Sequence, residues 1–131
     1  MWCIKTHSTE KPIQINIIQK LYLNLYPSRY NAYVFIEKTT EFDKWLKKLK
    51  DFKAKAKILF RIQKLETDEH FGDSKTVGDG IREMRINFAK GYRVYFKEKD
   101  GKIIVLLIGG DKSTQQKDIA KAKEIWKKLN E

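Results

Sequence analysis

The sequence predicts an α+β fold, a small domain in which a mainly antiparallel sheet packs with helices in the order β-α-α-β-β-β-α. Residues 103–108 form a continuous apolar run, as expected for a strand buried on both faces. The Asp-Gly pair at 100–101 precedes this run and favours a tight hairpin with the strand before it. Apolar residues at helical spacing in three other segments predict the helices.

The length and the charge of the chain limit the classes of protein to which it can belong. A chain of 131 residues is enough for one domain with a modest core. Its net charge of +11 favours a polyanionic partner, either nucleic acid, an acidic membrane face or an acidic protein. The alternative is a lysine-rich surface that only contacts solvent.

The cysteine content and the hydrophobic pattern indicate a cellular location. One cysteine excludes an internal disulfide and a cysteine-cluster zinc site, so a reducing cytoplasm is the expected compartment. No apolar run is long enough to span a membrane, and the first residues lack an apolar signal core. We therefore expect a cytoplasmic protein with no membrane partner.

Residues 1–29 differ from the rest of the chain. They contain both prolines and show no clean hydrophobic period, although apolar residues between 15 and 25 permit a short amphipathic helix. We therefore divide the chain into an N-terminal extension, residues 1–29, and one domain, residues 30–131.

The domain begins with a predicted strand and two predicted helices. Residues 30–37 are rich in aromatic and β-branched side chains, which favour a strand. Thr39 or Thr40 is expected to cap the first helix, because two acids follow in its first turn. Its apolar face comprises Phe42, Trp45, Leu46 and Leu49. A second helix is expected from about residue 52 to 66, with an inner face of Ile58, Leu59, Ile62 and Leu65.

The second half of the chain predicts a loop, three strands and a last helix. Residues 67–80 contain three glycines and few apolar side chains, so we expect a loop that carries function or only connects elements. Strands are expected at 81–86 and 92–96, and Gly109 and Gly110 are expected to end the central strand. Residues 113–116 resemble a capping box for the last helix. The inner face of that helix comprises Ile119, Ala122, Trp126 and Leu129.

Three cations fall on neighbouring predicted strands or at a strand end: Arg85, Arg93 and Lys112. A guanidinium binds phosphate through a planar fork, and aromatic rings stack on unpaired bases. Tyr95 shares a strand face with Arg93, whereas Tyr92 points to the opposite face. This pattern of cations and aromatic residues indicates a phosphate or RNA site.

Cleavage of RNA without a metal requires a proton acceptor for the 2′-hydroxyl, charge stabilisation at the phosphate and a proton donor for the leaving 5′-oxygen. Arg85 and Arg93 can stabilise the charge, and Lys112 can donate the proton. The sequence contains no glycine-rich phosphate loop and no metal-ligand spacing, so we expect no cofactor and no metal. Candidate proton acceptors are Glu83, His70 and Asp111.

A structural alternative exists for the same residues. Glu83 lies on the strand face of Arg85 and can simply pair with it or with a neighbouring cation. The arginines then line an ordinary polar sheet face. His70 can be a surface histidine with no chemical role.

Five segments of the sequence together carry a resemblance to a known family: FDKWLKKLKD at 42–51, AKILFRIQKLE at 56–66, HFGDSKTVGDGIREMRI at 70–86, GYRVYF at 91–96 and LLIGGDKSTQQKDIAKAKEI at 106–125. In this order they resemble the HigB-like addiction-module killer proteins of the RelE/ParE superfamily. The similarity covers residues 30–131.

The resemblance implies a RelE-like fold and the function of a toxin in a type II toxin–antitoxin system. Such a toxin is a ribosome-dependent endoribonuclease that cleaves mRNA and stops translation. Its expected partners are mRNA, the ribosome and a helix-turn-helix antitoxin, and it would contact operator DNA only through that antitoxin. By position, Arg85, Arg93 and Lys112 match the basic catalytic residues. The expected RNA-binding residues are Lys75, Tyr92, Tyr95, Ser113 and Gln115.

The same superfamily implies one alternative, since its ParE branch inhibits DNA gyrase without acting as an enzyme. A third hypothesis is an inactive relative that only binds nucleic acid. Induced expression separates the three, because they differ in growth arrest and in the state of the mRNA.

Overall fold

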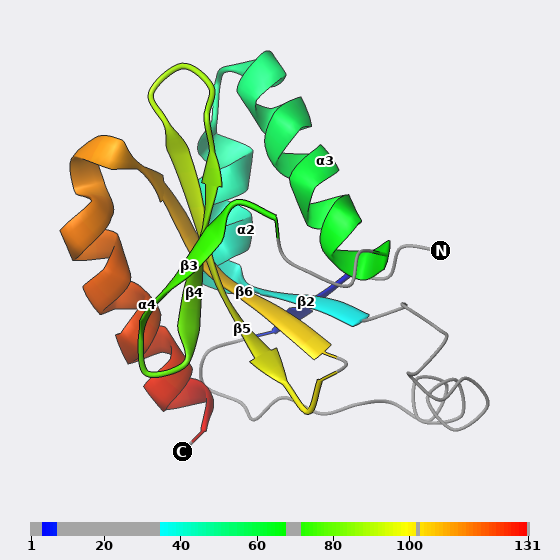
Figure 1. Cartoon of the computed structure of the whole chain (residues 1–131), viewed down its shortest axis with the longest axis vertical. Coiled ribbons are helices and arrows are strands. Elements are labelled where there is room, and N and C mark those ends of the chain that lie inside the picture. The colour runs from blue at the N-terminus through cyan, green and yellow to red at the C-terminus, as the bar shows by residue number, and fades with distance from the viewer. Residues whose placement is uncertain (1–3, 8–34, 68–71, 102, 131) are drawn as a thin grey trace.

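The computed structural model describes residues 4–7, 35–67, 72–101 and 103–130, and Figure 1 shows their arrangement. The elements in chain order are β1 (Ile4–His7), β2 (Phe35–Thr39), α2 (Thr40–Lys48), α3 (Phe52–Thr67), β3 (Ser74–Gly78), β4 (Ile81–Ile86), β5 (Tyr92–Lys99), β6 (Ile103–Asp111), the short 3-10 helix η1 (Lys112–Thr114) and α4 (Gln115–Leu129).

One sheet of six strands runs through the described part of the chain in the order β1-β2-β6-β5-β4-β3. Strands β3 to β6 pair antiparallel, whereas β2 is parallel to both β6 and β1. The predicted α+β class and the mainly antiparallel sheet are therefore confirmed.

Two strands were not predicted. β3 lies in the segment expected to be a loop, and β1 lies within the N-terminal extension and pairs with β2. The helix expected between residues 15 and 25, and the first five residues of the strand expected at 30–37, lie outside the described residues. The division of the chain at residue 29 stays a prediction.

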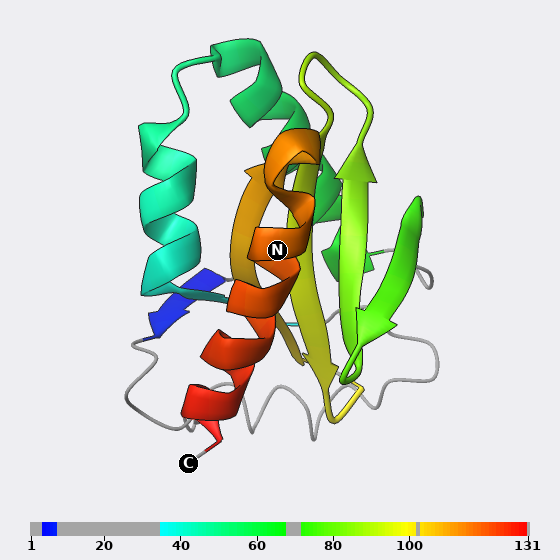
Figure 2. The ribbon, with the colours of Figure 1, turned by 90° about the vertical axis from the view of Figure 1, so that its left-hand side faces the viewer.

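Helices cover both faces of the sheet, as Figures 1 and 2 show. Alternate residues of each strand point to opposite faces, so the sheet contributes to two cores. The core on the side of α2 and α3 includes Phe42, Ile58 and Leu106, and the core on the side of α4 includes Tyr95, Leu107 and Ile125. The central strand β6 is buried in both, as its apolar run predicts.

The predicted cap of α2 is confirmed at Thr39. Its hydroxyl oxygen accepts a hydrogen bond from the amide of Phe42 at 3.0 Å and donates to the carbonyl of Leu107 at 2.6 Å. This side chain therefore satisfies an amide at the helix start and ties it to β6. At the start of α3, Asp51 accepts from the amide of Ala54 at 3.0 Å.

The end of the central strand was predicted wrongly. β6 does not end at Gly109 but continues to Asp111. The two glycines are required by close packing, because a side chain at Gly109 would collide with the Trp45 ring and one at Gly110 with the Asp118 carboxylate.

The capping box near residue 113 was also misplaced. The capping residues are Asp111 and Thr114, which enclose η1, and α4 begins only at Gln115. The strand, the short turn and the helix therefore follow one another without a gap, which brings the start of α4 next to the ends of β5 and β6.

Candidate functional site

The candidate site lies on the sheet face that α4 covers, where β4, β5 and β6 meet the start of that helix. Arg85 on β4 and Arg93 on β5 are directly opposite each other in the strand register. Two like charges in this position repel each other unless other groups compensate them. Each arginine has its own carboxylate, at 2.6 Å from Arg85 to Asp73 and 3.7 Å from Arg93 to Glu83.

Glu83 is the buried centre of this site. One carboxylate oxygen, Oε2, accepts a hydrogen bond from the Tyr95 hydroxyl at 2.9 Å and another from the Gln115 side-chain amide at 2.8 Å. The same oxygen lies 3.7 Å from Nε of Arg93, and the Lys75 ammonium lies 3.9 Å from Oε1. Glu83 is therefore enclosed by groups from β3, β5 and α4, and its cation partners are Arg93 and Lys75, not Arg85.

The Tyr95 hydroxyl is a permanent donor in this arrangement. Burial and the hydrogen bond to Glu83 raise the pKa of Tyr95 above its ordinary value. The phenol therefore stays protonated at physiological pH and keeps donating to the carboxylate.

The two tyrosines do not lie where base stacking would need them. Tyr95 is fully buried, and Tyr92 is 4% exposed within the core on the side of α2 and α3. The structure therefore offers neither ring to an unpaired base, and the expected stacking role does not fit this arrangement.

Lys112 directly follows β6 and, like Arg93, lies close to Gly91. Arg93 donates from Nη1 to the Gly91 carbonyl at 2.7 Å. A Cβ added at Gly91 would lie 3.3 Å from that Nη1 and 3.6 Å from Cβ of Lys112. The glycine, at a φ of +75°, therefore leaves room for the Arg93 guanidinium and the first carbon of the Lys112 side chain.

A surface hollow adjoins this pair and is lined by Lys90, Asp111, Lys112 and Ser113. The hydroxyl and the amide of Ser113 both donate to Asp111. These hydrogen bonds, that of the hydroxyl first, lower the pKa of Asp111 below its ordinary range. Asp111 is therefore an ionised carboxylate beside Lys112.

The structure thus brings together Arg85, Arg93, Glu83 and three of the expected RNA-binding residues, Lys75, Tyr95 and Gln115. Lys112 and Ser113 lie beside them at the strand end. His70 lies outside the described residues.

The sequence did not identify Asp73, which holds the Arg85 side chain in this site, or its hydrogen-bond partner Asn87. Asp73 holds Arg85, and the Asn87 amide donates to the other oxygen of Asp73 at 3.2 Å. The hydrogen bond from Arg85 lowers the pKa of Asp73. The signal available in the sequence was an Asp directly before β3, a strand that was not predicted.

Within the described residues, no group of three His, Cys, Asp or Glu side chains is placed to hold a metal ion. No helix in that same part of the chain is long and apolar enough to cross a membrane.

The fold and the site define the class of this protein, a small basic α+β domain with an arginine pair on the face of a mainly antiparallel sheet. The chain belongs to the family described as "Phage derived protein Gp49-like (DUF891)", whose model matches residues 44–127. It is also similar to an uncharacterized protein of Haemophilus influenzae, with 53% identity over 94 residues that cover 72% of this chain and 94% of the relative. The range of the family match includes every site residue from Lys75 to Gln115.

Proposed function

We propose that this protein is the toxin of a type II toxin–antitoxin system and that it cleaves mRNA on the ribosome without a metal ion. The observation that supports this proposal is the directly opposed pair Arg85 and Arg93, held by separate carboxylates beside Lys112. The resemblance to HigB-like toxins supports the same reaction. Two opposed guanidinium groups can both donate to the oxygens of one anion, which fits a phosphate of an RNA backbone.

In this proposal the two guanidinium groups bind the scissile phosphate and stabilise the charge that develops on it. Lys112 donates a proton to the leaving 5′-oxygen. Glu83 is enclosed and hydrogen-bonded, so its role is to hold Arg93 in place. The acceptor of the 2′-hydroxyl proton is then Asp111, which is ionised at the edge of the site, or His70.

The proposed partners follow from the same reasoning. The net charge of +11 suits contact with mRNA in the ribosome and with an acidic antitoxin. The antitoxin carries the helix-turn-helix, so the toxin contacts operator DNA only through it.

Induced expression followed by growth measurement and mapping of mRNA 5′ ends tests the proposal. We expect arrest with new codon-phased 5′ ends for the wild type. Arg85→Ala and Arg93→Lys should abolish these ends, since Arg93→Lys keeps a cation near Glu83 but removes the planar fork. Arg82→Ala is the matched control, because Arg82 lies on the opposite face of β4 and should leave cleavage unchanged.

Two results would contradict the proposal. Arrest with intact mRNA and stalled DNA cleavage complexes would favour a ParE-type gyrase inhibitor. Absence of arrest, with RNA binding that weakens steeply with salt, would favour a nucleic-acid-binding module without toxicity.

A further inference from the structure

A second feature of the surface lies apart from the residues assigned to the reaction above. It is a groove of about 440 Å³ between α3 and the connection from β4 to β5. Its apolar lining comes from Ala56 and Phe60 on α3 and from Ile86 and Phe88 on the other side. Phe60 is 59% exposed, which is unusual for so large an apolar side chain on a helix that has a separate buried face. The volume is in the range of ligand-binding pockets and accommodates a nucleobase.

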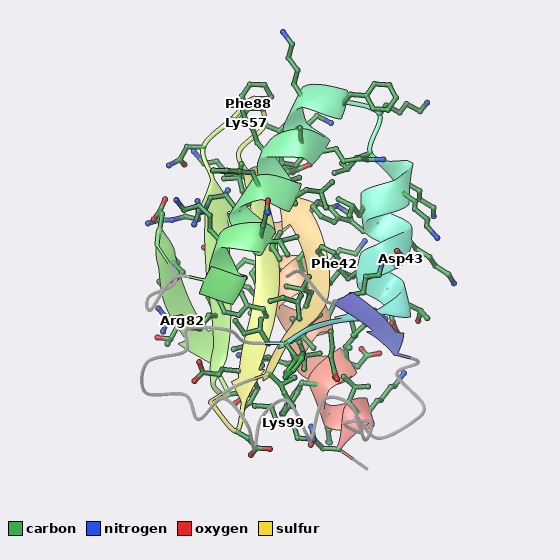
Figure 3. The ribbon with its side chains drawn as sticks, turned by 90° about the vertical axis from the view of Figure 1, so that its right-hand side faces the viewer. Phe42, Asp43, Lys57, Arg82, Phe88 and Lys99 are labelled. Atoms are coloured by element: carbon green, nitrogen blue, oxygen red, sulfur yellow. The ribbon has the colours of Figure 1, made fainter. Side chains whose placement is uncertain are left out.

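Cations and an amide form the remainder of the groove. Lys57, Arg61 and Asn87 line it. The Lys57 ammonium lies 5.0 Å from the centre of the Phe88 ring, and Figure 3 shows these two side chains together at the end of the hairpin. The Lys64 ammonium similarly lies 5.4 Å from the centre of the Phe60 ring. The groove therefore combines the exposed Phe60 ring and the half-buried Phe88 ring with positive charge.

This combination favours a nucleic acid over a protein. Lysine is depleted at the centre of protein–protein interfaces, whereas aromatic rings beside cations are typical of surfaces that bind single-stranded nucleic acid. On α3, whose described face toward solvent is rich in lysine, an unpaired base can stack on Phe60 while the ammonium groups contact phosphates.

The groove is connected to the arginine pair. Arg61, which lines the groove, donates from Nη1 to the backbone carbonyl of Arg85 at 2.8 Å. Asn87, which also lines it, donates to Asp73, the carboxylate that holds the Arg85 guanidinium. The groove lies on the α3 side of the sheet and the Arg85 guanidinium lies on the α4 side, so a strand of RNA that contacts both must pass around the end of β4 at Asn87.

We propose that this groove binds an unpaired base of single-stranded RNA, on the same strand whose phosphate the arginine pair holds. The choice of RNA rests on the proposed function, whereas the stacking site rests on the geometry of the groove. Phe60 supplies the stacking face, and Lys57 supplies a phosphate contact.

The experiment measures binding of a fluorescently labelled ten-nucleotide oligouridylate to the purified full chain, by anisotropy over a range of salt concentrations. Phe60→Ala should weaken binding about 5- to 150-fold, as expected for the loss of one stacked base, without changing the salt dependence. Lys57→Gln should reduce the slope of log affinity against log salt by about 0.7, as expected for one lost phosphate contact.

Phe52→Ala is the matched control. Phe52 is 79% exposed on the same helix and has Lys55 near its ring, but it does not line the groove. This variant should bind the oligouridylate as the wild type does. An RNA duplex should bind without sensitivity to Phe60→Ala, because its bases are not available for stacking.

Failure of this inference is distinguishable from failure of the proposed function. If Phe60→Ala binds oligouridylate as tightly as Phe52→Ala, or the wild type binds no oligouridylate, the base site is overturned and the groove is assigned to a protein partner. Mapping of mRNA 5′ ends tests cleavage separately, since Arg85→Ala alters cleavage through a residue that does not line the groove.

Discussion

A single hydroxyl, that of Tyr95, helps to hold the buried carboxylate of the site in place. It donates to a buried carboxylate that also lies beside Arg93. Tyr95→Phe keeps the ring but removes a hydrogen bond to a charged group, so we expect a loss of about 1.5–3 kcal/mol in the free energy of unfolding. Urea unfolding followed by circular dichroism measures it. Thr76→Val, which removes an exposed hydroxyl on β3, should change stability by less than about 0.5 kcal/mol.

Asp43 gives a prediction for the pH dependence of stability. The Asp43 carboxylate accepts a hydrogen bond from the Lys38 ammonium at 2.7 Å, and the Lys47 ammonium lies 2.8 Å from its other oxygen. Hydrogen bonds from these two lysines, that of Lys38 first, lower the pKa of Asp43. A carboxyl with a lowered pKa in the folded state stabilises the fold above its ordinary pKa, and this contribution is lost as the pH falls through the lowered value. We expect Asp43→Asn to reduce the free energy of unfolding by about 1 kcal/mol at neutral pH.

The difference between Asp43→Asn and wild type should therefore shrink below about pH 4, where this carboxyl begins to protonate in the unfolded chain. Urea unfolding at a series of pH values measures it. Glu41→Gln is the control, since Glu41 lies in the same first turn of α2 but has no ion pair to Lys38 or Lys47. An equal loss for Asp43→Asn at acid and neutral pH would contradict the ion-pair explanation.

Among the strands and helices, β6 is the least tolerant of substitution, because helices pack on both of its faces. Gly109 faces the Trp45 ring and leaves no room for a Cβ. We expect Gly109→Ala to displace α2 and to lower the free energy of unfolding by about 1–3 kcal/mol, as overpacking does. Thermal unfolding measures it. Gly101→Ala is informative for comparison, since nothing lies within 4 Å of its added Cβ and only its positive φ opposes the change.

These elements also show what the sequence can and cannot predict. Helical spacing identified α2, α3 and α4, and the apolar run identified β6, because burial imposes a period on the residues. β3 was missed because its side chains are mostly exposed at the sheet edge and three glycines lie within or next to it. The same edge explains why Asp73 was missed as the partner of Arg85. The burial of Glu83 was not predicted either, since the start of α4, which supplies Gln115, comes close only in the folded molecule.

At the scale of the whole molecule, β6 joins the two cores into one cooperative unit. Leu106 is fully buried on the side of α2 and α3, and the neighbouring Leu107 is fully buried on the side of α4. If either core unfolds, one face of β6 becomes exposed to solvent. The described sheet therefore cannot keep one core intact while the other unfolds. Unfolding should therefore be a single transition.

Leu106→Ala tests this coupling. It should lower the free energy of unfolding by about 2–5 kcal/mol through the cavity it leaves. The transition should shift equally by circular dichroism and by tryptophan fluorescence in a Trp2→Phe, Trp45→Phe background, where Trp126 reports from the opposite core. Leu107→Ala in a Trp2→Phe, Trp126→Phe background, with Trp45 as the reporter, is the mirror experiment. Separate transitions for the two signals would show that the faces unfold independently, and the arginine pair would then be held by the α4 side of the sheet alone.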